Sequence, residues 1–200
     1  MKERTGAEHL SNEQKSQLLV RARAAAARSL GISFEGIPDL SSLPSPSGRL
    51  AEPGMCFVTW KKAGQLRGCI GSVEPVRPLW ADVQANAVHA LLDDPRFPPA
   101  TARELEGLEL EISVLSPFVR ASDPLQTVEI GVHGLLVGRG GRRGLLLPQV
   151  PVEWEWDVPQ FLAQACRKAG LPADAWRDAD TVVSTFEAEV FGDEDLPRDG

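Results

Sequence analysis

Two apolar runs that lie close together constrain the fold of this chain more than any other feature of its sequence. The first is Met55-Cys56-Phe57-Val58-Thr59-Trp60, and five residues later the hexapeptide Leu66-Arg67-Gly68-Cys69-Ile70-Gly71 begins. Short runs rich in apolar, β-branched and aromatic residues are typical of strands, and a glycine-containing loop between two of them favours a hairpin. The pattern predicts a β-hairpin over residues 55–62 and 65–71, with its turn at Ala63-Gly64.

The hexapeptide also carries the most concentrated chemistry of the chain: a thiol, a guanidinium group and two glycines within six residues. Glycines weaken a strand unless something must approach its backbone closely. A cysteine near an arginine can have an unusually acidic thiol. We therefore expect the functional site of the chain here, with Gly68 and Gly71 leaving the backbone beside Cys69 bare.

The faces of the hairpin follow from its turn. A two-residue turn pairs Cys69 with Val58 and Arg67 with Trp60, and side chains alternate between the two faces of a strand. This register places Arg67, Cys69, Trp60 and Cys56 on one face. Leu66, Ile70 and Phe57 then form the apolar face, which belongs on the core.

Composition narrows the classes of function. The chain has 200 residues, a net charge of −7 and no tyrosine, so it fits one domain, or one domain with a lobe, and excludes phenolic acid–base chemistry. The acidic balance disfavours broad binding to nucleic acid or to an anionic membrane. No apolar run is long enough to span a bilayer, and the polar N-terminus lacks the apolar centre of a signal peptide.

The three cysteines, Cys56, Cys69 and Cys166, are odd in number and form no CxxC pair. Reduced thiols and a cytoplasmic location are the expectation from this pattern. Histidine, cysteine and carboxylate residues show no recognised metal-ligand spacing, so the sequence predicts neither a metal nor another cofactor. A metal site assembled across the fold from Cys69, His133 and a carboxylate remains an alternative.

Helical signals occur in four places. Ser11 and Gln14 form a potential capping box for a helix from Ser11 to about Leu30, after which residues 31–54 read as a long loop. A second helix spans about 78–92, with Pro78 as its first residue. The pair Thr101 and Glu104 caps a short helix. A further helix covers about 158–169, with Asp157 as its N-cap and Gly170 directly after its end.

Strands fill much of the remaining chain. Residues 108–114 alternate strictly between apolar and polar side chains, which is the clearest strand pattern in the sequence. Further strands fit residues 131–137, 144–150 and 181–191, and the acidic tail 192–200 reads as frayed. Helices mixed with hairpins, without a βαβ rhythm, predict an α+β fold with largely antiparallel sheets and flanking helices.

Eight segments in a fixed order resemble one known family. The hexapeptide Leu-Arg-Gly-Cys-Ile-Gly (LRGCIG) is the most distinctive of them. The others are Gly54 to Thr59, Asn86-Ala87, Asp94-Pro95-Arg96-Phe97-Pro98-Pro99, Glu111 to Pro117, Gly131-Val132-His133-Gly134-Leu135, Gly144 to Val150 and Lys168 to Leu171. On these motifs the chain resembles the AMMECR-domain family, whose prokaryotic members are called AmmeMemoRadiSam system protein A.

The resemblance implies a single AMMECR-type domain over residues 1–195, with residues 31–54 as a variable loop. It implies two unequal lobes, the larger of which holds both termini. Such proteins are often encoded with, or fused to, a Memo-like protein and a radical SAM protein, so these are the implied partners, together with an unknown small molecule. The resemblance implies no settled activity.

Within the hexapeptide, two interpretations stay open. In the first, Cys69 is a thiolate favoured by the charge of Arg67, with His133 as its base, in an enzyme or enzyme component. In the second, Cys69 is a small buried hydrophobe and Arg67 forms a structural ion pair with Glu111 or Asp94. His133 would then be a buried histidine bonded to a backbone carbonyl.

For other polar residues, too, the sequence leaves open whether their role is to bind a ligand or to stabilise the fold. Asn86, Asp94 and Arg96 are candidates for binding, although Asp94 and Arg96 also fit a turn that holds the end of the second helix through side chain–backbone bonds. The side-chain amide of Asn86 can also form its hydrogen bonds with the backbone of its own helix. Three further arginines, Arg139, Arg142 and Arg143, form a basic hairpin tip that leaves nucleic-acid contact as a third possibility. A non-catalytic interaction module is the main alternative to an enzyme.

Overall fold

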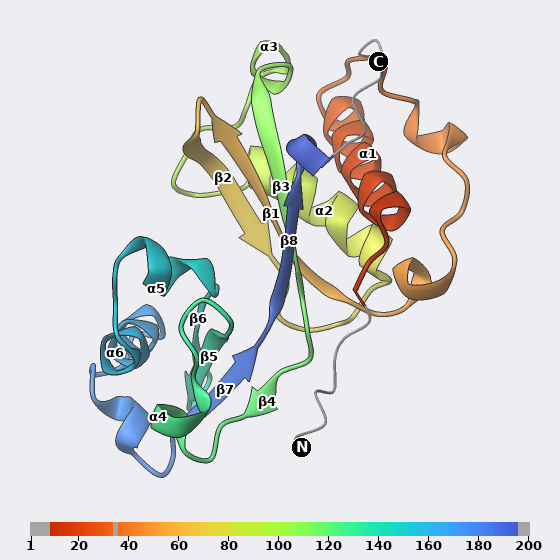
Figure 1. Cartoon of the computed structure of the whole chain (residues 1–200). Helices are drawn as coiled ribbons and strands as arrows, with labels where there is room; N and C mark the ends of the chain where they lie inside the picture. The colour runs from red at the N-terminus through yellow and green to blue at the C-terminus, as the bar shows by residue number, and fades with distance from the viewer. Residues whose placement is uncertain (1–8, 34–35, 196–200) are drawn as a thin grey trace. The chain divides into compact units, whose positions relative to one another are not determined.

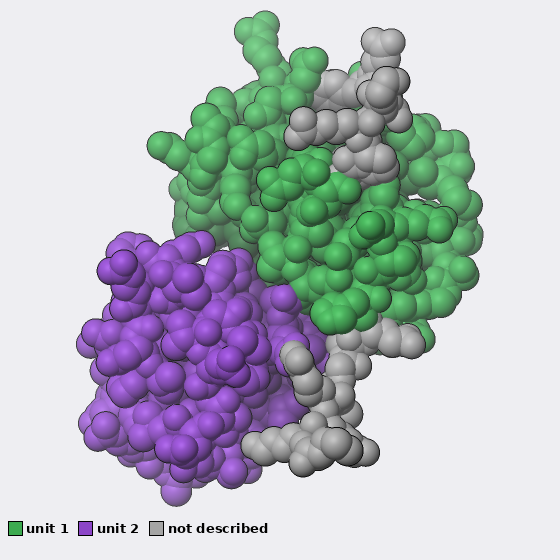
Figure 2. Space-filling model, in the orientation of Figure 1, with its two compact units in different colours: residues 1–114, 189–200 green, residues 115–188 purple. Residues whose placement is uncertain are grey.

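The chain folds into two compact units. The computed structural model describes residues 9–33 and 36–195. The first unit runs through Val114 and resumes at Glu189, and the second spans Leu115–Ala188 (Figure 2). Each unit contains one four-stranded sheet with helices beside it (Figure 1). The predicted α+β fold class, with two unequal units and largely antiparallel pairing, is confirmed.

The first unit contains the strands β1, β2, β3 and β8, in the spatial order β2-β1-β3-β8. Its described elements are α1 (Asn12–Ser29), the 3₁₀ turns η1 (Leu40–Ser42) and η2 (Gly48–Ala51), β1 (Met55–Lys62), β2 (Gln65–Gly71), α2 (Leu79–Leu92), α3 (Ala102–Leu105), β3 (Leu108–Leu115), β8 (Ala188–Gly192) and η4 (Asp193–Asp195). Because β2 lies at the end of this order, one of its edges has no neighbouring strand.

The helix ends follow the signals in the sequence. Ser11 caps α1 with both hydrogen bonds of a capping box, and Thr101 does the same for α3. The helix α1 stops where Gly31 takes the left-handed conformation that glycine adopts without steric cost, at φ 67°. Pro78 was predicted to be the first residue of α2. In the structure it is the N-cap, and the helix begins one residue later, at Leu79.

The hairpin has the predicted turn but a different register. Ala63 and Gly64 both have positive φ, as a two-residue turn of this kind requires. A β-bulge then shifts the pairing between Trp60 and Lys61, so that Cys69 lies opposite Thr59 and Trp60 opposite Gly68. The predicted pairings of Cys69 with Val58 and of Arg67 with Trp60 are therefore wrong, because the bulge inserts one unpaired residue into β2.

The shifted register also reverses the faces of the hairpin. Cys56, Val58 and Trp60 are fully buried against the helices, and the Trp60 indole donates a hydrogen bond of 2.9 Å to the Ala87 carbonyl in α2. Cys69 lies on the opposite face of the sheet, together with its partner Thr59. Of the three residues predicted to form the apolar face, Ile70 packs on the core, Leu66 is exposed and Phe57 shares the face of Cys69.

The second unit has its own sheet and its own core. Its elements are β4 (Val119–Arg120), α4 (Pro124–Thr127), β5 (Gly134–Arg139), β6 (Arg142–Leu146), α5 (Gln149–Glu153), α6 (Val158–Lys168), η3 (Ala175–Arg177) and β7 (Val182–Phe186), with the strand order β4-β7-β5-β6. The helix α6 packs on β5 and β6 through Phe161, Leu162 and Ala165, which are fully buried. Its predicted N-cap, Asp157, and its terminal Gly170 are confirmed.

Three strand predictions in the C-terminal half need correction. The strand expected at 131–137 begins only at Gly134, and the strand expected at 144–150 ends at Leu146, before α5. The alternating segment 181–191 is two strands, β7 and β8, which separate at Glu187 and join different sheets. Alternation reports that every second residue is buried, but it does not report which sheet buries it.

The start of the acidic tail is held in place. Asp193 accepts a hydrogen bond of 2.9 Å from Arg23 Nε and one of 2.7 Å from the Leu110 amide. The tail was predicted to be frayed from residue 192 onward, which is wrong for residues 192–195, while residues 196–200 lie outside the described chain. Among the described residues, no helix combines the length and apolar character that crossing a membrane requires.

Candidate functional site

The free edge of β2 is closed at Cys69 by two charged side chains. The Cys69 amide donates to Asp94 Oδ2 at 2.9 Å, and the Arg96 guanidinium donates to the Cys69 carbonyl at 3.3 Å. Arg96 and Asp94 are themselves joined at 2.6 Å. The Asp94 side chain is only 2% exposed, and the guanidinium group of Arg96 lowers the pKa of its carboxyl group, with a further contribution from the Cys69 amide. The Asp94-Pro95-Arg96 turn thus takes the place of a neighbouring strand.

The thiol of Cys69 is partly buried and is not acidic. Burial raises its pKa above the ordinary value. The Thr59 hydroxyl, which donates to Sγ at 3.2 Å, and the charge of Arg96 oppose this shift without cancelling it. The unusually acidic thiol expected from the sequence is therefore not what this environment produces. Arg67, the residue expected to favour the thiolate, is not among the groups that shift the pKa of Cys69.

Arg67 is bound to a partner that the sequence did not suggest. Its Nε lies 3.2 Å from Glu104 Oε1, and its Nη2 donates to the Pro98 carbonyl at 3.0 Å. The predicted partners, Glu111 and Asp94, are wrong: Glu111 pairs with Lys61 at 2.7 Å, and Asp94 pairs with Arg96. The guanidinium group of Arg67 lowers the pKa of Glu104 to about 2. The charge of Arg67 is therefore balanced within the chain.

Both glycines of the hexapeptide are explained by packing. A Cβ atom at Gly68 would lie 1.9 Å from the Ala90 carbonyl oxygen, so only glycine lets α2 pass this close to β2. A Cβ atom at Gly71 would lie 2.3 Å from the ring of Phe57, which covers the strand there. The bare backbone expected beside Cys69 is thus occupied by the chain's own atoms.

Asn86 belongs to a separate buried cluster on the core side of β1. Its Nδ2 donates to the Cys56 carbonyl at 3.2 Å and to Asp82 Oδ2 at 3.1 Å. Asp82 also accepts from the Cys56 amide and the Ser72 hydroxyl, and its other oxygen lies 3.0 Å from Arg77. Asp82 was not among the residues predicted from the sequence, although a carboxylate beside the apolar stripe of a helix is a signal of a buried polar contact.

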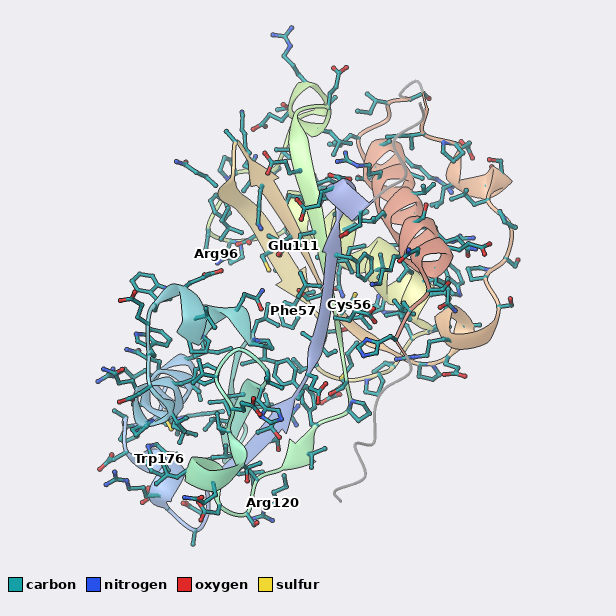
Figure 3. The ribbon with its side chains drawn as sticks, viewed as in Figure 1. Cys56, Phe57, Arg96, Glu111, Arg120 and Trp176 are labelled. Carbon is teal, nitrogen blue, oxygen red and sulfur yellow. The ribbon has the colours of Figure 1, made fainter. Side chains whose placement is uncertain are left out.

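Arg96, Phe57, Glu111 and Cys56 all belong to the first unit, and Figure 3 shows them on and around its sheet. Cys69 and Cys56 lie on opposite faces of that sheet. The candidate residues of the first unit therefore divide into two environments. Arg67 and Cys69 belong to the edge strand β2, and Asp94 and Arg96 bind its backbone. Asn86 and Cys56 lie on the core side of β1.

His133 lies in the second unit, outside this group. Its Nδ1 accepts a hydrogen bond of 3.1 Å from the Glu129 amide, and its own amide donates to the Glu129 carbonyl at 3.0 Å. The sequence predicted that the His133 ring would bond to a backbone carbonyl. The ring nitrogen Nδ1 instead accepts from a backbone amide.

The basic hairpin tip in the second unit is also engaged. Arg139 forms ion pairs with Asp178 at 2.7 Å and Asp180 at 3.2 Å, and Arg142 donates to the Gly170 carbonyl at 3.1 Å. The two carboxylates offset the positive charge of Arg139, which nucleic-acid binding would use. The bond of Arg142 to a neutral carbonyl leaves the charge of Arg142 in place. Within the part of the chain that the structure describes, no three histidine, cysteine or carboxylate side chains gather as metal ligands.

The sequence of this chain is similar to that of one protein family and of several archaeal proteins. The AMMECR1 family model matches residues 23–191. Protein MK0488 of Methanopyrus kandleri is 48% identical over 158 residues, which cover 75% of this chain and 76% of that protein. A protein of Thermococcus gammatolerans is 50% identical over 137 residues, or 66% of each chain.

One solved structure matches the fold closely. The crystal structure of the uncharacterised protein PH0010 from Pyrococcus horikoshii superposes with a TM-score of 0.81 at 38% sequence identity, over 92% of this chain and 94% of that one. The two chains therefore share their fold over the matched residues.

Proposed function

Because this chain belongs to the AMMECR1 family, we propose that it is a non-catalytic component of a system that includes a Memo-like and a radical SAM protein. The partner classes are those that the family resemblance implies. The local geometry around Cys69 supports the non-catalytic part of the proposal. The three cysteines, all free, support a reducing, cytoplasmic setting.

The partial burial of Cys69 beside arginines that are paired with carboxylates carries this proposal, because burial raises the pKa of the thiol. A thiolate, not a thiol, is the nucleophile in cysteine chemistry, and catalytic cysteines lie near unpaired cations or a base that lower their pKa. Here Arg67 is paired with Glu104 and does not lower the pKa of Cys69, and Arg96, which is paired with Asp94, lowers it less than burial raises it. Near neutral pH, Cys69 therefore carries its proton.

The same contacts indicate what the hexapeptide does. Asp94 and Arg96 close the edge of β2 at Cys69, and Gly68 lets α2 pack directly behind the strand. A closed strand edge does not accept a further strand from another chain. We infer that the hexapeptide builds a rigid platform and that partners contact this unit through side chains.

Alkylation of Cys69 as a function of pH tests the proposal that this thiol is not a catalytic nucleophile. Iodoacetamide should modify Cys69 at pH 7 no faster than it modifies glutathione, with a midpoint above pH 9 because the pKa is raised from 9.0. The Cys69→Ser variant assigns the signal, since Cys56 and Cys166 are buried. Rapid alkylation at pH 7 would overturn the proposal.

Co-purification tests the partners. The tagged chain and its Cys69→Ser variant should both retain a Memo-like or radical SAM protein expressed from the same genome. Recovery of neither protein by the unmodified chain would contradict the partner assignment, whatever the reactivity of Cys69.

A thiol enzyme component is the second candidate, and the partial exposure of Cys69 favours it. The two candidates differ in one outcome. If Cys69→Ser retains its partners but abolishes turnover by the reconstituted system, the thiol takes part in the chemistry.

A further inference from the structure

An exposed aromatic surface follows α5 in the second unit. Trp154 is 66% exposed and Val152, two residues before it, is 55% exposed. Apolar side chains exposed close together are candidates for a contact surface. The Trp154 ring stacks on Trp156, with centroids 6.0 Å apart and planes 20° from parallel. Trp156 in turn packs on the core of the unit, so the exposed ring is held in a defined place. We call residues 152–157 the Trp154 surface.

The backbone of this surface takes a conformation that its sequence does not favour. Glu155 has φ 51°, the left-handed conformation. Its amide donates to the Val152 carbonyl and the Trp156 amide donates to the Pro151 carbonyl, which together form the Schellman ending of α5. Glycine is the usual residue at this position, and a residue with a Cβ atom is disfavoured there. The chain nevertheless presents a carboxylate at this point.

Three acidic residues adjoin the two tryptophans in the sequence. Glu153, Glu155 and Asp157 alternate with the two tryptophans, and all three are exposed. Neither Glu153 nor Glu155 forms an ion pair with any residue that the structure describes. Asp157 accepts the Gln160 amide as the N-cap of α6. An exposed aromatic ring attracts cations through its face, and exposed acidic residues next to it in the chain add charge complementary to a cationic side chain.

A groove continues from Trp156 along α6. Its volume is about 390 Å³, and it is lined by Trp156, Pro159, Gln160, Ala163, Gln164 and Arg167. The floor offers apolar surface, and the two glutamines offer both donors and acceptors for a peptide backbone. Arg167 lies ten residues beyond Asp157, roughly 15 Å along the helix, so it does not neutralise the carboxylates at the other end.

We propose that the Trp154 surface binds an extended segment of a partner protein that carries a lysine or arginine. The cationic side chain lies against the Trp154 ring between Glu153 and Glu155, and the rest of the segment follows the groove on α6. Cation–π attraction and charge complementarity together select a basic segment over a neutral or acidic one. This inference rests on the second unit alone and does not depend on the role of Cys69.

Binding of a synthetic arginine–glycine peptide to the full chain tests the proposal. Isothermal titration should detect binding that weakens with salt, and a glutamate–glycine peptide of equal length should not bind. Trp154→Ala should weaken binding about tenfold, because it removes the cation–π contact. Since the side chain is exposed, this variant should keep the circular dichroism spectrum of the unmodified chain.

Matched charge variants distinguish peptide binding at the Trp154 surface from the general attraction of a basic peptide to an acidic protein. Glu155→Gln should weaken binding about threefold, whereas Glu106→Gln, an equal charge change at an exposed residue of the first unit, should leave it unchanged. Glu155→Gly should weaken binding and yet raise the melting temperature, because glycine relieves the positive φ. Absence of binding, or equal losses in Glu106→Gln and Glu155→Gln, would overturn the proposal.

Discussion

Single residues around the hexapeptide have properties that their neighbours in sequence do not reveal. Arg67 is two positions from Cys69, yet its charge is balanced by Glu104. Asp94, from the turn after α2, instead binds the Cys69 amide. The two glycines make room for Ala90 and Phe57. Each of these roles depends on a residue brought near by the fold, and each can be tested by one substitution.

Gly68→Ala should destabilise the protein by about 3 kcal/mol, because the new methyl group would meet backbone, which cannot rotate away. Gly71→Ala is the matched comparison. There the obstacle is the ring of Phe57, which can shift at lower cost. Urea unfolding measures both free energies. Equal stability of Gly68→Ala and the unmodified chain would show that α2 does not constrain this strand.

Glu104→Gln should cost about 2 kcal/mol at pH 7, because it removes the charged partner of the largely buried Arg67. The folded-state pKa of Glu104 is lowered to about 2 from the ordinary 4.5. A lowered pKa stabilises the folded protein above the ordinary value, and this contribution is lost as the pH falls through the folded-state value. The stability difference between variant and unmodified chain should therefore shrink between about pH 5 and pH 2. A difference that does not change with pH would exclude this ion pair as its cause.

At the scale of elements, β2 is an edge strand whose exposed backbone is satisfied by side chains. Asp94 accepts from the Cys69 amide, and Arg96 donates to its carbonyl. Most edge strands avoid pairing by being short, bulged or charged. This one has a bulge near Arg67 and a turn that covers Cys69, so the hairpin ends in a closed edge.

Asp94→Ala should open this edge. It leaves the Cys69 amide and Arg96 without their acceptor, which we expect to cost about 2–3 kcal/mol. Hydrogen exchange at the Cys69 amide should accelerate along with the loss of stability. Asp93→Ala is the control, since Asp93 is exposed and pairs with His89 on the surface of α2. If both variants lose the same free energy, the Asp94 contacts do not stabilise the edge.

Sequence patterns predicted elements well where the signal was local. The capping boxes at Ser11, Thr101 and Asp157 and the turn at Ala63 are all present. The patterns failed where a distant partner decided the outcome. The bulge at Arg67 accommodates contacts to Glu104 and Pro98, and the segment 181–191 is divided between two sheets, which alternation does not detect.

At the scale of the whole molecule, the described residues form two hydrophobic cores that have no residue in common. One core is built around Trp60, Ile112 and Leu18, and the other around Phe161, Leu135 and Val137. The chain passes between the units near Leu115 and again near Ala188. Because each core draws only on its own unit, a defect in one should first affect the stability of that unit.

Phe161→Ala tests this separation. Removing a fully buried phenylalanine should cost about 3–5 kcal/mol. Native-state hydrogen exchange should show lost protection in β5, β6 and α6, while β1 and α2 keep theirs. Trp60→Ala should give the converse pattern. Equal loss of protection in both units would mean that they unfold as one.

The sequence by itself determined the α+β class, the helix caps, the hairpin turn and the family, because these depend on local periodicity, on capping residues and on motifs in a fixed order. Only the tertiary structure decided the environment of Cys69. The bulge moved it opposite Thr59, burial raised its pKa, and Asp94 and Glu104 paired with the arginines around it. Burial and ion pairing are properties of neighbours in space, and contacts across tens of residues are not encoded in local spacing.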